Sequence, residues 1–251
     1  MLIELIRRDL RTRFVGSRSG WLWTVLTPLM LLGVYAVVFG VIFRARVPEG
    51  MDIPFVAWLA IAMWPWLAFQ DAILRATASM PEHANLIAKV ALPRDLLALS
   101  NATTAFLLQC LGYLAVLLAL PLFGVDLTWR GLPAALLSLT ALYGLAAGLG
   151  FIAAGLRPFF RDLETLLPTL MMFWFFLTPI LYAPQMLPEE WQDLWLLNPV
   201  AGLMNDLRAA MLEGAVLPGR STWIMLAAGG TMFVVGRSFF RRLAPYFEDY
   251  L

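Results

Sequence analysis

Long apolar segments recur along the chain, and they constrain its fold more than any other feature of the sequence. A membrane-spanning helix needs about 20 predominantly apolar residues. Hydrophobic residues make up 61% of the chain and charged residues only 14%, whereas a typical soluble domain has about 25% charged residues. We therefore predict an all-α polytopic membrane protein, folded as a single transmembrane domain over residues 1–251. Six segments predict transmembrane helices: Trp21–Phe43, Ile53–Leu74, Leu96–Phe123, Leu132–Leu156, Leu166–Tyr182 and Trp223–Phe240.

One further apolar segment, residues 194–212, contains polar and helix-breaking residues: Asn198, Pro199, Asn205, Asp206 and Arg208. An ionisable side chain at the centre of a bilayer costs several kcal/mol. We therefore expect a broken or re-entrant pair of short helices rather than a seventh span. We place this outer re-entrant segment at residues 184–215.

The basic residues favour one orientation. With six spans and the N-terminus inside, the cytoplasmic segments hold 13 basic residues and the outer segments 5, which together are the 18 in the chain. Basic residues concentrate in cytoplasmic loops. A seventh span would place Arg241 and Arg242 outside. The sequence therefore predicts a multi-pass protein with both termini in the cytoplasm.

Residues 2–14 have the pattern of an amphipathic helix. Apolar residues fall on one helical face: Ile3, Ile6, Leu10 and Phe14. Arginines occupy the remaining surface: Arg7, Arg8, Arg11 and Arg13. Such a helix lies in the headgroup layer, with its arginines near anionic membrane lipid. We predict an interfacial helix within residues 1–18; the alternative is a basic flank that only orients the first span.

A polar stretch at residues 79–99 separates the second and third apolar segments. It contains the only histidine, His83, and the only lysine, Lys89, of the chain. Pro81 can begin a helix, and Pro93 tends to end one. Between them, polar residues alternate with apolar ones, which suits a short cytoplasmic helix with one face on the bundle. The alternative, a solvated connecting loop, is the one that composition alone favours.

Several kinds of functional site are excluded. A P-loop needs lysine after glycine and before serine or threonine, but Lys89 lies in the sequence AKV. One histidine and one cysteine (Cys110, an expected core residue) make a zinc site implausible, so we expect no metal, no catalytic residue and no cofactor in this chain. A net charge of +1 argues against a nucleic-acid partner. Asp71 and Arg75 are one helical turn apart, and we expect a local ion pair there rather than a proton relay.

Aromatic residues cluster on two of the expected spans. Tyr35, Phe39 and Phe43 recur every fourth residue of the first span, and the fifth span contains Phe173, Trp174 and Phe176. Aromatic faces suit the C–H groups of sugars and provide a surface along which a polymer can slide. The alternatives are an aromatic belt at the membrane interface and packing between helices.

The sequence RRDLRTRFVGSRSGWLWTVLTP resembles the start of the permeases of type-2 ABC exporters, through Arg8–Ser17 and Gly20–Pro28. Among these it most resembles permeases that export O-antigen, related surface polysaccharides and teichoic acid. The later stretches FFRDLETLLP, TPILYAPQMLP and LNPV are similar too, so the resemblance covers nearly the whole chain. Capsule exporters share R-T-R-F and G-x-L-W, which leaves the polymer open.

The resemblance implies a transport subunit, not an enzyme, in the bacterial cytoplasmic (inner) membrane. It implies a homodimer with two copies of a cytoplasmic ABC ATPase, which would bind ATP and Mg. Residues 81–94 would form a coupling helix that contacts this ATPase through Glu82, His83, Asn85, Lys89 and Arg94.

The resemblance also assigns the aromatic residues a role. Spans one and five of two copies would enclose a conduit for a polyprenyl-diphosphate-linked glycan, lined by Tyr35, Phe39, Phe43, Phe173, Trp174 and Phe176. Two other functions stay open from the sequence. One is export of a small amphiphile or drug by the same fold, and the other is a non-transporting membrane scaffold for glycan synthesis.

Overall fold

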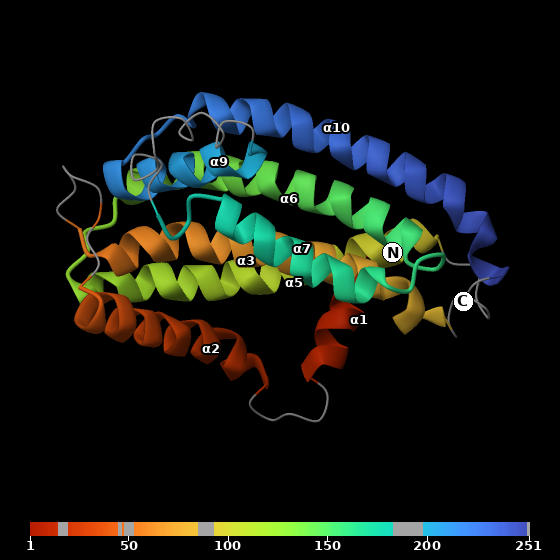
Figure 1. The fold of residues 1–251 in the computed structure, drawn as a ribbon, viewed down its shortest axis with the longest axis horizontal. Coiled ribbons are helices and arrows are strands. Elements are labelled where there is room, and N and C mark those ends of the chain that lie inside the picture. Colours follow the sequence, from red (N-terminus) through yellow and green to blue (C-terminus); the bar gives the residue numbers. More distant parts are fainter. Residues whose placement is uncertain (15–19, 45–46, 48–52, 85–92, 183–197, 250–251) are drawn as a thin grey trace.

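The computed structural model describes residues 1–14, 20–44, 47, 53–84, 93–182 and 198–249. All regular elements in these ranges are helices, and the long ones run side by side along one axis (Figure 1). In chain order they are α1 (Leu2–Phe14), α2 (Gly20–Tyr35) with its π-helical continuation η1 (Ala36–Ile42), α3 (Phe55–Glu82), α5 (Arg94–Ala119), η2 (Leu120–Phe123), η3 (Trp129–Gly131), α6 (Leu132–Leu156), α7 (Leu163–Leu177), α9 (Pro199–Arg208), η6 (Ala209–Glu213), α10 (Arg220–Leu243) and η7 (Ala244–Asp249). The expected all-α architecture is confirmed.

In the described part of the chain, five helices are long and apolar enough to cross a membrane: Leu22–Ile42, Phe55–Glu82, Arg94–Phe123, Trp129–Leu156 and Arg220–Phe247. They correspond to five of the six expected spans. The remaining span corresponds to α7, an apolar helix of 15 residues. At 1.5 Å per residue α7 is about 22 Å long, which is shorter than a hydrocarbon core of about 30 Å. The protein is therefore a polytopic helical membrane protein whose fifth apolar helix is short.

The fifth apolar helix ends before the boundary that the sequence predicts. The expected span reached Tyr182, but α7 ends at Leu177, and Thr178 has extended backbone angles (φ −95°, ψ 133°). Pro179 follows Thr178, and the helical region is sterically disfavoured for a residue before proline. Local backbone sterics thus end the helix although the apolar sequence continues.

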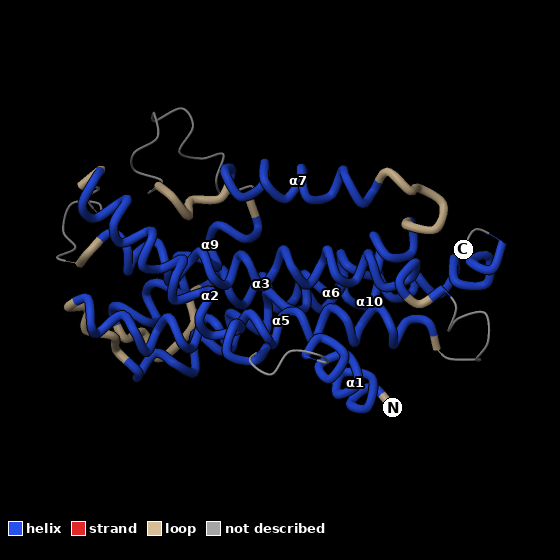
Figure 2. Tube along the Cα trace, turned by 90° about the horizontal axis from the view of Figure 1, so that it is seen from below, coloured by secondary structure: helices blue, strands red, loops and turns tan. Residues whose placement is uncertain are grey.

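The most buried helix of the bundle is α3, and it lies at the centre of the helices in both views (Figures 1 and 2). In the most apolar part of this helix 83% of the residues are buried, compared with 11% in the first span and 22% in the last. A helix that is apolar on all sides belongs in the interior, and residues Phe55–Trp66 are indeed buried without a break. The outer surfaces of α2 and α10 are left to face lipid or a partner.

Small residues allow α6 and α10 to approach closely. A Cβ atom on Gly148 would lie 2.5 Å from the carbonyl carbon of Met232, and one on Gly236 would lie 2.2 Å from the Gly148 oxygen. Close approach through small residues is a common way to associate helices in membranes. These glycines therefore let the backbones of α6 and α10 pack in direct contact.

Both chain termini lie at one end of the bundle, called here the terminal end, while α9 lies at the opposite, α9 end (Figure 1). At the terminal end α1 packs on α5 and forms the expected helix, with the arginine side chains at positions 7, 8 and 11 exposed. The Arg13 side chain is outside the described part. The buried face differs from the expected one: Leu5 packs against the core, whereas Ile3 is 74% exposed.

Candidate functional site

The aromatic row of the first span forms as expected. The ring centroids of Tyr35 and Phe39 are 5.8 Å apart, and those of Phe39 and Phe43 are 5.9 Å apart. Phe39 also packs on Phe55 of α3, at 5.5 Å. Phe43 is 67% exposed, whereas Tyr35 and Phe39 are half-buried. The row therefore packs on α3 through Phe39 and ends in an accessible ring.

The aromatic residues of α7 divide into two groups. Trp174 packs edge-on against Trp66 and Phe69 of α3, with centroid distances of 5.8 and 5.3 Å. Its Nε1 donates a hydrogen bond to Asn198 Oδ1 at 3.1 Å. Phe173 and Phe176, in contrast, are 60% and 56% exposed. The structure thus gives Trp174 a packing role and leaves two accessible rings on the other side of α7.

Asn198 joins α7 to α9. Its Oδ1 caps α9 by accepting from the Val200 N–H at 3.1 Å, besides accepting from Trp174. Its Nδ2 donates to Thr178 Oγ1 at 2.8 Å and to the Leu177 carbonyl at 3.3 Å. A single amide therefore fixes the end of α7 against the start of α9.

Arg208, at the end of α9, is only 4% exposed. Its guanidinium group lies 3.4 Å from the centroid of the Trp58 ring. The Nε donates to the Trp58 carbonyl at 3.2 Å, Nη1 to the Pro179 carbonyl at 3.0 Å, and Nη2 to the Ile180 carbonyl at 3.2 Å. A further bond from Nη1 reaches Asn205 Oδ1 at 3.3 Å. Arg208 thus connects α3, the turn after α7, and α9.

From the sequence, Arg208 is one of the polar residues that interrupt the apolar segment 194–212, and no functional role was assigned to it. Its signal was visible, because an ionisable side chain within an apolar segment of a membrane protein is a candidate functional residue by default. The expected re-entrant segment is partly described: α9 and η6 form a short helical unit at Pro199–Glu213, and its membrane depth stays a prediction. Asp206 in this unit caps α10 by accepting from the Thr222 N–H and hydroxyl, both at 2.8 Å.

The expected coupling segment is described only at its two ends, and Asn85 and Lys89 lie outside the described residues. Pro81 does not begin a helix, which corrects the expectation; it lies in the last turn of α3, which ends at Glu82. The neighbouring Met80 is fully buried, and its packing extends α3 past the proline. Pro93 occupies the position directly before α5.

The described coupling residues make contacts within the chain. Glu82 pairs with Arg75 at 3.4 Å, and His83 Nδ1 lies 2.9 Å from the Ser79 carbonyl, to which it can donate. The expected ion pair between Asp71 and Arg75 is wrong, because Arg75 pairs with Glu82 and Asp71 accepts from Gln109 at 3.5 Å.

His83 and Arg8 lie together at the terminal end, although the sequence assigned them to separate sites. Both line a small polar cavity of about 80 Å³ between α1, the end of α3 and the start of α5. Asp9, Thr12, Ser100 and Asn101 complete its polar lining. The N-terminal helix therefore lies directly beside the start of the expected coupling segment.

Asp95, which the sequence reasoning missed, connects the start of α5 to the end of α10. Its carboxylate is 5% exposed and lies 2.9 Å from Arg237 Nη2 and 2.8 Å from Arg241 Nη2. Beside it, Arg94 Nη1 donates to the Ala244 carbonyl of η7. The partners are far apart in sequence, so no local pattern could have identified them.

A hydrophobic cluster, separate from the main core around α3, lies under these charges. It joins the terminal ends of α3, α5, α6, α10 and η7 through buried side chains that include Met80, Leu97, Phe151, Phe240 and Phe247. The ring of Phe247 is fully buried and packs on Phe240 with centroids 5.3 Å apart. Both described ends of the coupling segment are thus anchored to one packed unit.

No group of three or more His, Cys, Asp or Glu residues within the described ranges could hold a metal ion. The described candidate site consists of accessible aromatic rings on α7 and directly after η1, a buried arginine at the α9 end, and a charged cluster at the terminal end. The arrangement suits binding and movement.

Residues 2–212, from α1 to η6, match the family model of the ABC-2 type transporter. The chain belongs to the ABC-2 transporter family. An O-antigen export system permease of Klebsiella pneumoniae is 28% identical, with 100% of this chain and 95% of the relative aligned. A protein of the same name from Myxococcus xanthus is 30% identical over 91% of this chain and 86% of its own length. A polysialic acid transport protein of Escherichia coli is 25% identical over 86% of this chain and 83% of its own length.

Membership of the ABC-2 family confirms the resemblance to type-2 exporter permeases. With its apolar helices, it identifies the chain as a multi-pass protein of the bacterial inner membrane and as a transporter permease subunit. The matched range includes both aromatic rows, the coupling segment and Arg208. Asp95 lies within the ABC-2 match, whereas its partners Arg237 and Arg241 lie beyond it.

Proposed function

We propose that this chain is the membrane-spanning subunit of an ATP-driven exporter that moves a polyprenyl-diphosphate-linked polysaccharide, such as O-antigen, across the bacterial inner membrane. The observation that carries this proposal is the alignment of O-antigen export permeases over 91% to 100% of the chain. The accessible rings of Phe43, Phe173 and Phe176 support it, because they offer stacking faces to sugars. A permease of this family requires an ATPase partner, which binds ATP and Mg.

We assign fewer residues to the conduit lining than the six that the sequence predicts. Phe173 and Phe176 are exposed on α7, and Phe43 is exposed directly after η1. Tyr35, Phe39 and Trp174 act mainly by holding α2, η1 and α7 against α3. We therefore assign sugar contact to the exposed phenylalanines and support to the half-buried rings.

A second copy of the chain completes the proposed conduit. Only 11% of the α2 window is buried, and Met171 is the one buried residue of α7. Both helices thus retain long apolar surfaces that a homodimer would cover. Each copy would bind one ATPase, which gives two ATPase subunits for each exporter.

The terminal end is the proposed cytoplasmic end. Basic side chains gather there, among them Arg75, Arg94, Arg157, Arg237 and Arg241. Cytoplasmic segments of membrane proteins are rich in arginine and lysine. The ATPase would contact residues 81–94 at this end, beside α1, and α9 would lie at the outer end of the conduit.

A depletion experiment tests the polysaccharide assignment. Cells that lose the chain should accumulate lipid-linked glycan on the inner face of the membrane, and glycan should disappear from the cell surface. Restoring the chain should reverse both effects. Restoring it together with a partner ATPase that lacks its P-loop lysine, in place of the normal ATPase, should reverse neither. Normal surface glycan after depletion, with loss of export of a small amphiphile, would favour the drug-exporter alternative.

A charge exchange tests the coupling segment. Glu82→Lys combined with Lys89→Glu should reduce co-purification of the ATPase and abolish export, while the amount of protein in the membrane stays normal. Glu164→Gln, which removes an ion pair with Arg157 at the same end, is the matched control and should retain export. If the double variant exports at the normal rate, residues 81–94 are only a loop.

A further inference from the structure

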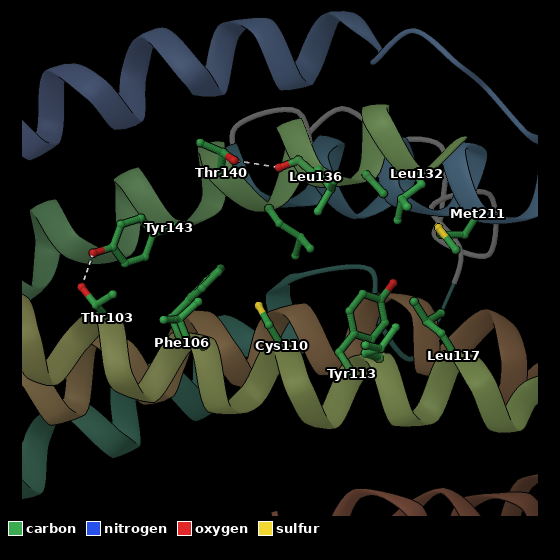
Figure 3. A pocket seen from close by; sticks show the side chains of 14 residues that line it. Thr103, Phe106, Cys110, Tyr113, Leu117, Leu132, Leu136, Thr140, Tyr143 and Met211 are labelled. Atoms are coloured by element: carbon green, nitrogen blue, oxygen red, sulfur yellow. Dashed lines mark hydrogen bonds between the residues drawn. The ribbon is translucent and has the colours of Figure 1, made fainter. Parts of the chain in front are cut away.

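A cavity of about 440 Å³ lies between α5 and α6, away from the predicted coupling and conduit residues. Leu117, Leu132 and Met211 line it at the α9 end, and Thr103 and Tyr143 line its opposite end (Figure 3). Cys110 lies on its wall between these ends. Volumes of this size are typical of ligand sites.

The lining of the cavity identifies the chemistry of its occupant. None of its described lining residues is charged, and the four hydroxyl groups among them already have partners within the protein. Tyr143 pairs with Thr103 at 2.5 Å, Thr140 donates to the Leu136 carbonyl at 2.8 Å, and Tyr113 donates to the Ile61 carbonyl at 3.1 Å. An occupant is therefore offered only apolar contact, and water is disfavoured in such a space. The fitting ligand is a hydrocarbon chain.

The cavity opens sideways rather than toward the aqueous end of the bundle. At the α9 end η3 packs directly on η6: the Thr128 N–H donates to the Met211 carbonyl at 2.9 Å, and a Cβ atom on Gly131 would lie 1.7 Å from the Ala210 oxygen. On the flank, the lining residues Leu107 and Leu136 are 52% and 54% exposed. A hydrocarbon chain would therefore enter from the bilayer itself.

The length of the cavity matches one leaflet. Leu132 and Tyr143 are eleven residues apart on α6, which corresponds to about 16 Å, and half of a hydrocarbon core is about 15 Å. Directly before α6, Trp129 is 43% exposed and Arg130 is exposed. A tryptophan and an arginine in this position suit the level of the lipid headgroups, where the guanidinium group complements a phosphate.

We propose that this cavity binds one acyl chain of a membrane phospholipid from the leaflet at the α9 end, with the phosphate beside Arg130. The chain fills the space between α5 and α6 that protein side chains leave open. A polyprenyl chain is longer than a leaflet and does not match the length of the cavity. The proposal requires only that the protein is embedded in a membrane, so it stands independently of the transported substrate.

Lipid retention in matched variants tests this proposal. Leu139→Trp adds volume inside the cavity, whereas Leu111→Trp adds the same ring on the exposed flank of α5, outside it. After detergent washing, native mass spectrometry should show one phospholipid retained per chain in the unmodified protein and in Leu111→Trp. Occupancy should fall at least tenfold in Leu139→Trp and should decrease in Arg130→Gln. Equal retention in the two tryptophan variants would overturn the proposal.

A second measurement uses the unmodified protein, so it does not depend on how the variants fold. A phosphatidylglycerol that carries a photoreactive diazirine in its acyl chain is reconstituted with the protein, and the labelled peptides are identified by mass spectrometry. Labels should concentrate on residues 103–117 and 132–143, including Cys110, the only cysteine in the chain. Labels spread evenly over the exposed leucines of α2, α7 and α10 would overturn the proposal, as would a polyprenyl phosphate as the retained lipid.

Discussion

Replacement of Arg208 by methionine should loosen the α9 end of the bundle. The variant keeps a long apolar side chain but removes the bonds to the carbonyls of Trp58, Pro179 and Ile180. Pro179 and Ile180 lie outside any helix, and each buried carbonyl that loses its partner costs about 1–3 kcal/mol. Loss of the guanidinium from the Trp58 ring adds about 0.5–2 kcal/mol.

An opposing effect reduces this loss. Burial of a charge costs several kcal/mol, and the variant avoids that cost. We therefore expect the free energy of unfolding to fall by about 2–4 kcal/mol. Most of this loss comes from the carbonyls of Pro179 and Ile180, which lose their hydrogen-bond donor. For a chain of this size, that change corresponds to a melting temperature lower by roughly 4–16 °C.

The assay is thermal unfolding of the purified protein in detergent, together with hydrogen exchange of the backbone at residues 178–182 and 199–208. Arg220→Met is the matched control, because it removes an exposed arginine at the same end of the bundle. The control should melt within about 2 °C of the unmodified protein, since surface substitutions rarely exceed about 0.5 kcal/mol and each kcal/mol lowers the melting temperature by about 2–4 °C. If Arg208→Met also melts within that range and its exchange is unchanged, Arg208 does not hold the α9 end.

Three further predictions concern other parts of the molecule. Asp95→Asn should release the end of α10 and raise hydrogen exchange in η7, because the carboxylate pairs with Arg237 and Arg241. Glu164→Gln is the control and should leave η7 protected, and equal exchange in both variants would contradict the pairing. Trp174→Leu should destabilise the protein by about 1.5–4.5 kcal/mol through two lost ring contacts and one lost hydrogen bond. In contrast, Phe173→Leu with Phe176→Leu should reduce surface glycan at normal stability, and normal surface glycan would make these rings lipid-facing. In a Cys110→Ala background, Leu217→Cys should react with a membrane-impermeant maleimide from outside, because the position is 79% exposed. Tyr246→Cys should react only after the membrane is permeabilised, and reaction of both from one side would refute the proposed topology.

The positions of the long helices could be predicted from the sequence because a bilayer demands both length and apolar composition in each span. The window Leu132–Leu156, for example, corresponds to α6 with the same bounds. Composition could not give the end of α7, which depends on the backbone sterics of Thr178 before Pro179. The prediction that Pro81 begins a helix was wrong, because α3 continues past it to Glu82 through the tertiary packing of Met80.

The sites were less predictable than the spans. The row of Tyr35, Phe39 and Phe43 followed from helical spacing, which depends only on neighbouring residues. The separation of Trp174 from Phe173 depends on which side of α7 meets α3, and a single sequence does not encode that rotation in a readable way. Asp95 finds its partners more than 140 residues away. Contacts of that range require the three-dimensional fold.

ATP-dependent transport in inverted inner-membrane vesicles tests the central claim most directly. The vesicles contain the chain, its ATPase and radiolabelled lipid-linked polysaccharide on the outer surface, which corresponds to the cytoplasmic face. If the chain is a polysaccharide export permease, ATP should move the labelled glycan into the lumen, where it becomes protected from an added glycosidase. Vesicles without the chain should show no protection. Equal protection with and without the chain, or protection that does not require ATP, would contradict the proposed function.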